Sequence, residues 1–133
     1  MTNQPTGVVI AVVDDDRRIL EALEILLESA DYAVRSFASA TALLASGCLA
    51  KVDCLISDID MPVMDGFEVL RVVRAERPEL PIILITGVPD IPDRLPPVGA
   101  GNYLLFKKPF DGQELLTAIT DALWNQLPRS RQS

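Results

Sequence analysis

Five short apolar runs divide the chain, and each is rich in valine, isoleucine, leucine or aromatic residues. They occupy residues 8–13, 33–37, 54–57, 82–85 and 103–106. Their lengths are those of β-strands. The runs VVIAVV and IILI are apolar at every position, which is typical of strands buried on both faces of a parallel sheet. The pattern therefore predicts five strands.

Helical periodicity marks the segments between the first four runs and the segment after the fifth. Ser39 is a suitable N-terminal cap for a short helix, and Asp111 with Glu114 has the spacing of a capping box. Pro128 ends the last helix. We expect helices over residues 17–30, 39–44, 66–75 and 111–127.

Strands that alternate with helices predict the α/β class, with parallel strands joined by right-handed crossovers. The link between the fourth and fifth runs, GVPDIPDRLPPVGAG, is long enough for a helix but carries four prolines. The adjacent Pro96 and Pro97 each bias the preceding residue away from helical geometry. We expect no continuous helix over residues 92–99, so that a fourth helix there is shortened or replaced by a loop.

Composition narrows the possible chemistry. The chain has 133 residues, enough for one domain, and a formal charge of −7 from 19 acidic and 12 basic residues. It contains no histidine, which excludes a histidine general base, a Ser-His-Asp triad and a histidine-ligated metal. The acidic balance argues against direct nucleic-acid binding by this domain, because contact with the phosphate backbone needs a basic face.

The cysteines and the first residues indicate the compartment. Cys48 and Cys54 are the only cysteines, and their spacing fits neither a metal site nor a Cys-x-x-Cys motif. We interpret them as reduced thiols, with Cys54 in the core. The first residues are polar, unlike a secretory signal, and no apolar run approaches the length of a membrane span. We therefore expect a cytoplasmic protein without membrane insertion.

Ionisable and hydroxyl side chains follow four of the five predicted strands. Asp14 and Asp15 follow the first, Asp58 the third, Thr86 the fourth and Lys108 the fifth. The carboxyl ends of parallel strands share one edge of the sheet, where ligands of such folds bind. Two carboxylates about 4 Å apart repel each other by roughly 4 kcal/mol at an effective dielectric near 20, so a cation is needed among them. A hard divalent ion such as Mg²⁺ fits these oxygen ligands.

The same set fits phosphoryl transfer. A carboxylate can attack phosphorus and form an acyl phosphate, with Lys108 and Thr86 as partners for the phosphoryl oxygens. Each residue alone also fits a structural role: the acidic run as a first helical turn, Asp58 as a turn former, Thr86 as a strand end and Lys108 as a surface lysine. Their common position at one end of four strands favours a site.

Four motifs carry a family resemblance: VVDDD at residues 12–16, SDIDMPVMDG at 57–66, ITG at 85–87 and KPF at 108–110. On these motifs the chain resembles the receiver domain of two-component response regulators over residues 7–127. The resemblance implies a doubly wound five-stranded parallel sheet of the flavodoxin-like order 2-1-3-4-5. We assign residues 7–127 to a receiver domain and residues 128–133 to a disordered tail.

The resemblance also implies roles for individual residues. Asp58 would be the phosphoacceptor, and Asp14 and Asp15 would hold Mg²⁺ or Mn²⁺ together with it. Asp60 would contact the metal through its backbone carbonyl.

On the other side of the site, Thr86 would supply the hydroxyl that moves to the phosphoryl group on activation, and Lys108 the amine that pairs with the phosphate. A cis peptide bond is implied between Lys108 and Pro109. The chain departs from the family where Leu105 replaces the usual tyrosine or phenylalanine, and in the proline-rich segment before it.

The function expected from these features is a phosphorylation-dependent switch, not an enzyme. A histidine kinase or histidine phosphotransfer protein would donate the phosphoryl group, and the added charge would alter binding to a downstream protein. The chain leaves no room for an effector domain after residue 127, so we expect a stand-alone receiver or one cut from a longer regulator.

Three alternatives remain open. The altered region over residues 86–108 suits a receiver-like module that binds partners without phosphate. Asp58-Ile59-Asp60 resembles the nucleophile motif of aspartate-dependent phosphohydrolases of the haloacid dehalogenase class, although that motif normally closes the first strand. A nucleotide-binding sheet is the third alternative, but the chain lacks a glycine-rich phosphate loop.

Overall fold

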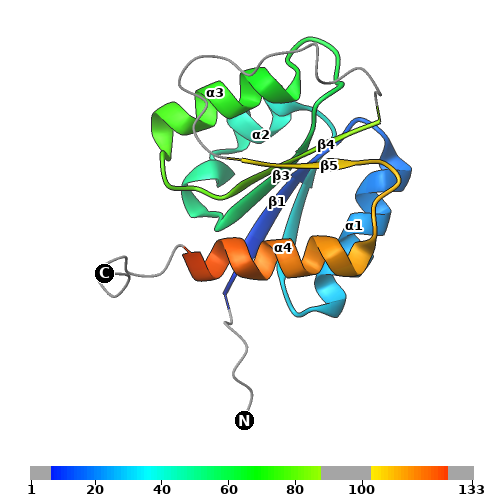
Figure 1. Cartoon of the computed structure of the whole chain (residues 1–133). Helices are drawn as coiled ribbons and strands as arrows, with labels where there is room; N and C mark the ends of the chain where they lie inside the picture. The colour runs from blue at the N-terminus through cyan, green and yellow to red at the C-terminus, as the bar shows by residue number, and fades with distance from the viewer. Residues whose placement is uncertain (1–6, 88–102, 126–133) are drawn as a thin grey trace.

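The computed structural model describes residues 7–87 and 103–125, which form five strands, four α-helices and one 3₁₀ helix (Figure 1). In chain order these elements are β1 (Val9–Val13), α1 (Arg17–Ser29), β2 (Ala33–Phe37), α2 (Ala40–Ser46), η1 (Cys48–Lys51), β3 (Cys54–Asp58), α3 (Gly66–Glu76), β4 (Ile82–Thr86), β5 (Leu104–Lys107) and α4 (Gly112–Asn125). All five predicted strands are present, and their ends differ from the prediction by at most one residue.

All strands are parallel and lie in the order β2-β1-β3-β4-β5. The central strands β3 and β4 are buried at every position, as the continuous apolar runs predicted. After β1 the chain forms β2 on one side of β1, and it then crosses to the other side of β1 to form β3. The predicted doubly wound α/β fold of order 2-1-3-4-5 is therefore confirmed.

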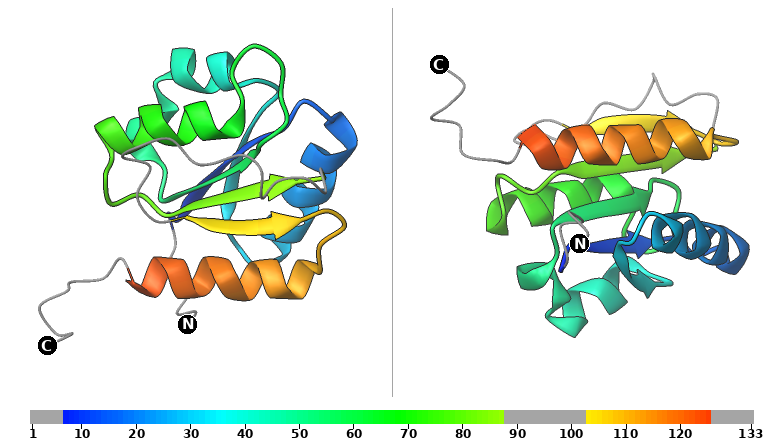
Figure 2. Two further views of the ribbon diagram at one scale, coloured as in Figure 1. Left: turned by 45° about the horizontal axis from the view of Figure 1, so that its top comes forward. Right: turned by 90° about the horizontal axis from the view of Figure 1, so that it is seen from below.

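Helices cover both faces of the sheet (Figures 1 and 2). Helices α2 and α3 lie on one face, and α1 and α4 lie on the other. Successive strand residues alternate between the two layers, because side chains along a strand point to opposite sides. Leu55 and Leu84 pack with α2 and α3, whereas Ile56 and Ile83 pack with α1 and α4. The sheet thus has two hydrophobic cores, one on each face.

The two cysteines belong to different cores. Cys48 packs on the α2 and α3 side and Cys54 on the α1 and α4 side, and both are buried free thiols. Burial raises the pKa of the Cys54 thiol to about 12, which keeps it protonated at neutral pH. The prediction that Cys54 is a core residue is confirmed.

Side-chain caps fix where the helices begin. Ser39 caps α2 by accepting a hydrogen bond from the backbone of Ala42, as predicted. Asp111 accepts from the Gln113 backbone at the start of α4. The spacing Asp-x-x-Glu at Asp65 forms a complete capping box for α3, which the sequence analysis did not identify.

Two expectations concern residues outside the described ranges: the absence of a continuous helix over residues 92–99, between β4 and β5, and the disordered tail over residues 128–133. The peptide bond between Lys108 and Pro109 is cis, as the resemblance implied. Within residues 7–87 and 103–125, no helix combines the length and the apolar character that a membrane crossing requires.

Candidate functional site

The sheet brings the predicted residues to one edge. Asp14 and Asp15 directly follow β1, Asp58 is the last residue of β3, Thr86 is the last residue of β4, and Lys108 directly follows β5. All of these strands are parallel, so their carboxyl ends meet at the same edge. Residues that are up to 94 positions apart in the sequence therefore become neighbours.

Backbone hydrogen bonds continue the sheet beyond the strand ends and hold this edge in place. The Asp14 N–H donates to the Phe37 carbonyl at 3.1 Å. The Ile59 N–H donates to Ile85 at 2.8 Å, and the Lys108 N–H donates to Thr86 at 2.7 Å. The site therefore lies on a rigid frame, which suits groups that must keep a fixed geometry.

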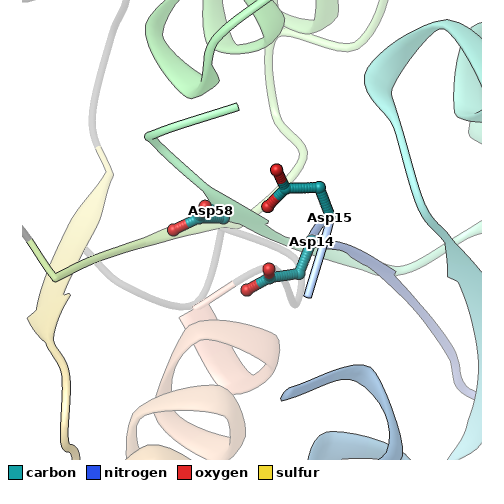
Figure 3. A group of neighbouring side chains, drawn as sticks. All are labelled: Asp14, Asp15 and Asp58. Carbon is teal, nitrogen blue, oxygen red and sulfur yellow. The ribbon is translucent and has the colours of Figure 1, made fainter. Parts of the chain in front are cut away.

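Three carboxylates converge (Figure 3). One oxygen from each of Asp14, Asp15 and Asp58 lies within 4.8 Å of the others. Asp14 is 2 % exposed and Asp58 is 4 % exposed, while Asp15 is exposed to solvent. The Asp16 backbone N–H donates to Asp14 Oδ1 at 2.8 Å and fixes that side chain. The cluster thus has two buried members and one at the surface.

Lys108 bridges the two buried carboxylates. Its Nζ lies 3.2 Å from Asp14 Oδ2 and 3.3 Å from Asp58 Oδ1, but its hydrogen-bond geometry is met only toward Asp14. The lysine side chain is 24 % exposed. One positive charge thus faces two buried negative charges.

Burial and neighbouring charges together shift the pKa values of Asp58, Asp14 and Lys108. Burial raises the pKa of Asp58 to about 6; the charge of Asp14 adds to the effect, Lys108 opposes it and Asp60 adds a smaller contribution. Burial likewise raises the pKa of Asp14 against the stabilising contacts of Asp16 and Lys108. Burial lowers the pKa of Lys108, but the charges of Asp14 and Asp58 outweigh burial, so this pKa is raised overall. Lys108 is therefore a full positive charge at neutral pH.

The donor set fits a hard divalent cation. Asp58 Oδ1 is buried and accepts no hydrogen bond from the described residues. A buried oxygen in this condition is costly unless another partner satisfies it. All donors in the cluster are carboxylate oxygens, the ligands that Mg²⁺ and Mn²⁺ prefer. The cluster contains none of the nitrogen or sulfur ligands typical of zinc. Asp14, Asp15 and Asp58 are thus compatible with the predicted ion.

Asp60 lies in the loop between β3 and α3, and its side chain reaches the fourth strand. Thr86 Oγ1 donates a hydrogen bond to Asp60 Oδ2 at 3.0 Å, and Thr86 is fully buried. The family resemblance implies a role only for the backbone carbonyl of Asp60. The carboxylate contact depends on the path of the loop, and no motif spacing indicates it.

A glycine fixes that path. The Gly66 N–H donates to the Ile59 carbonyl at 2.9 Å, and a Cβ added at Gly66 would lie 2.7 Å from the Asp58 carbonyl oxygen and from the Ile59 Cα. Only a glycine lets the start of α3 approach the end of β3 this closely. Gly66 is not among the predicted site residues; the signal in the sequence that could have indicated it is the Asp65-Gly66 pair directly before a predicted helix.

Comparison with known proteins identifies the family. The sequence profile of the response regulator receiver domain matches residues 10–120. The chain belongs to this family. All the candidate residues of the receiver domain, from Asp14 to Lys108, lie inside the matched range. The resemblance that the motifs indicated is thereby confirmed.

Relatives and solved structures agree. This receiver domain is 43 % identical to the response regulator protein TmoT of Ectopseudomonas mendocina over 115 residues, which cover 86 % of this chain and 52 % of TmoT. The chain spans about half the length of the first curated relatives it matches. A CheY-like receiver domain of Methanospirillum hungatei JF-1 is 29 % identical with a TM-score of 0.82, covering 91 % of this chain and 97 % of that one.

A third match is to a receiver domain activated by BeF3. The BeF3-activated receiver domain of DrrB is 28 % identical to this receiver domain, with a TM-score of 0.78. The match covers 89 % of this chain and 98 % of the DrrB domain. Because that receiver domain is activated by BeF3, beryllofluoride is a suitable probe for the candidate site of this chain.

Proposed function

We propose that this receiver domain is a phosphorylation switch and that Asp58 is its phosphoacceptor. The observation that carries the proposal is the state of Asp58, a buried carboxylate whose Oδ1 accepts no hydrogen bond within residues 7–87 and 103–125 and lies 3.3 Å from the Lys108 amine. Its pKa of about 6 leaves it ionised at neutral pH and thus able to act as a nucleophile. The donor would be a histidine kinase or a histidine phosphotransfer protein.

The metal would be Mg²⁺ or Mn²⁺. Asp14, Asp15 and Asp58 would hold it through their carboxylates and Asp60 through its backbone carbonyl. The ion would supply positive charge that offsets the repulsion between these carboxylates and an incoming phosphoryl group.

The chain's own groups account for the remaining requirements of the transfer. An Asp58 oxygen forms the new P–O bond while the P–N bond of a phosphohistidine donor breaks and its electron pair returns to the imidazole. Lys108, held at this position by Asp14, pairs with a phosphoryl oxygen, and the Thr86 hydroxyl donates to another. The product is an acyl phosphate on Asp58.

The output is a change in partner binding. A phosphoryl group adds a charge of about −1.5 to −2 at one edge of the sheet, which can bias a two-state surface. The protein then acts as a signalling switch in the cytoplasm, with slow self-dephosphorylation and no turnover of a separate substrate. Its partners are the phosphoryl donor and a downstream protein.

Intact-mass measurement tests this proposal. We expect acetyl phosphate with Mg²⁺ to add one phosphoryl group to the wild-type chain, and neither Asp58→Asn nor chelation of the metal to allow the addition. Labelling of Asp58→Asn would identify a different acceptor. Labelling that persists in the presence of a chelator would remove the metal from the reaction.

A second candidate function is a receiver that signals without phosphate. Leu105 stands where the family usually has an aromatic switch residue, and it is 40 % exposed on β5. This exposed apolar side chain can contact a partner whether or not Asp58 is phosphorylated. Equal partner affinity before and after acetyl phosphate treatment would favour this candidate.

A further inference from the structure

The Thr86 hydroxyl already has a charged partner when Asp58 carries no phosphate. Its Oγ1 donates to Asp60 Oδ2 at 3.0 Å; Thr86 is fully buried and Asp60 is partly buried. We propose that Asp60 is a positioning residue whose carboxylate holds this hydroxyl in the resting state and competes for it with a phosphoryl group on Asp58. The inference rests on the proposed function, because it concerns the response of the same site.

Thr86 can change partner only by rotating its side chain. Its carbonyl accepts from the Lys108 N–H at 2.7 Å, and the preceding carbonyl, that of Ile85, accepts from the Ile59 N–H at 2.8 Å. The backbone of Thr86 is thus fixed by strands on both sides. Threonine χ1 occupies discrete staggered states, so the hydroxyl either faces Asp60 or has left it.

Asp60 is held equally well. The Ile59 carbonyl accepts from the Met61 N–H at 3.1 Å and from the Gly66 N–H at 2.9 Å, so the chain on either side of Asp60 is tied to the end of β3. The close approach of Gly66 to the Asp58 carbonyl leaves little room for this turn to shift. The backbone of Asp60 is therefore held next to Thr86, and the proposed change involves the hydrogen bond between their side chains.

Competition follows from the chemistry of a hydroxyl. Thr86 has a single proton to donate, and a carboxylate and a phosphoryl oxygen are both charged acceptors. A hydrogen bond to a charged group is strong enough that its loss changes an equilibrium by about tenfold or more. Breaking the bond to Asp60 is thus a cost that phosphoryl binding must offset, and removing the Asp60 carboxylate removes that cost.

A double-mutant cycle separates this effect from simple repulsion. Asp60→Ala also deletes a negative charge near an anion site, which alone would tighten anion binding. Thr86→Val removes the hydroxyl but keeps the branched shape. If Asp60 acts through Thr86, the effect of Asp60→Ala depends on which residue occupies position 86. If Asp60 acts only through its charge, the effect is the same in both backgrounds.

The measurement is the apparent Kd of beryllofluoride at a fixed, saturating Mg²⁺ concentration for the wild type, the two single variants and the double variant. We expect Asp60→Ala to tighten beryllofluoride binding about tenfold when Thr86 is present and at least threefold less in the Thr86→Val background. Equal tightening in both backgrounds, or no tightening in either, overturns the inference and leaves the proposed function intact. A wild-type chain that binds no beryllofluoride, as expected for Asp58→Asn, overturns both.

A second readout needs no ligand. Three-bond couplings to the Thr86 methyl group report its χ1 state in the unphosphorylated chain, and Thr120, whose hydroxyl lies 3.4 Å from that of Tyr32, serves as an internal reference away from the site. We expect one dominant χ1 state for Thr86 in the wild type and averaging in Asp60→Ala, with Thr120 unchanged. A Thr86 side chain that keeps one state in Asp60→Ala would show that Asp60 does not hold it.

Discussion

Asp58 carries a stability cost that a single isosteric substitution should remove. Burial raises its pKa from 3.8 to about 6, so the folded chain binds this proton more tightly than the unfolded chain does. Stability from this group is therefore present below pH 3.8 and is lost as the pH rises through 6. A difference of about two pKa units, at about 1.4 kcal/mol each, gives a cost of about 3 kcal/mol at pH 7.

Asp58→Asn keeps the shape of the side chain but cannot ionise. We expect the metal-free variant to be more stable than the wild type at pH 7 by about 3 kcal/mol, or about 10 °C in Tm for a domain of this size. The gain should fall to about half at pH 5 and nearly vanish at pH 4, because the unfolded wild type is then also protonated. Addition of Mg²⁺ should stabilise the wild type more than the variant.

Urea and thermal unfolding with a chelator present, repeated across this pH range, measure the effect. Glu21→Gln, which removes an exposed carboxylate on α1, is the matched control and should change stability little. A variant that is less stable than the wild type at pH 7 would refute the reasoning, since the Lys108 contact would then outweigh burial. A gain that does not shrink at low pH would trace the effect to packing instead of charge.

Two further predictions concern the metal cluster and the loop. Asp14→Ala and Asp15→Ala should each weaken Mg²⁺ binding in calorimetric titration without lowering the metal-free Tm, because each relieves repulsion between carboxylates. A clear drop in Tm for both would show that these side chains stabilise the metal-free fold. Gly66→Ala should lower both Tm and Mg²⁺ affinity, because the added Cβ would lie 2.7 Å from backbone atoms. In the control Gly112→Ala, the added Cβ would meet only the flexible Leu26 side chain, at 3.1 Å. Equal effects of the two substitutions would show that the close approach at the start of α3 does not matter.

The fold was predictable because burial leaves a strong trace in the sequence. Strands β3 and β4 are buried on both faces, and their runs of apolar residues are continuous. The C-terminal ends of these two strands were harder to predict. Asp58 and Thr86 are polar and were placed after the runs, yet each completes its strand, since hydrogen bonds between backbone groups do not depend on side-chain polarity.

The proximity of the candidate site residues was predictable from topology, but their pairing was not. Parallel strands bring their carboxyl ends to one edge, so the positions of Asp14, Asp58 and Lys108 follow from the fold alone. Two contacts could not be predicted: which carboxylate oxygens Lys108 contacts, and the hydrogen bond from Thr86 to Asp60. Both depend on side-chain rotamers and on the path of the loop after β3, which the close approach of Gly66 to backbone atoms determines. Neither leaves a periodic signal. The Val63 backbone, with a φ of 71° that is rare for a β-branched residue, was hidden for the same reason.

The burial that makes Asp58 costly also explains how the site can respond to one group. An exposed carboxylate would be screened by water, and a new charge on it would act weakly on its neighbours. At 4 % exposure, the charge of Asp58 acts on Asp14 and Lys108 through a medium of lower dielectric. In the proposed switch, a phosphoryl group on this carboxylate would change the balance of the Lys108 contacts and offer a new acceptor to the Thr86 hydroxyl. The stability that the fold gives up at this edge would then couple the chemistry of one oxygen atom to the strands that carry Lys108 and Thr86.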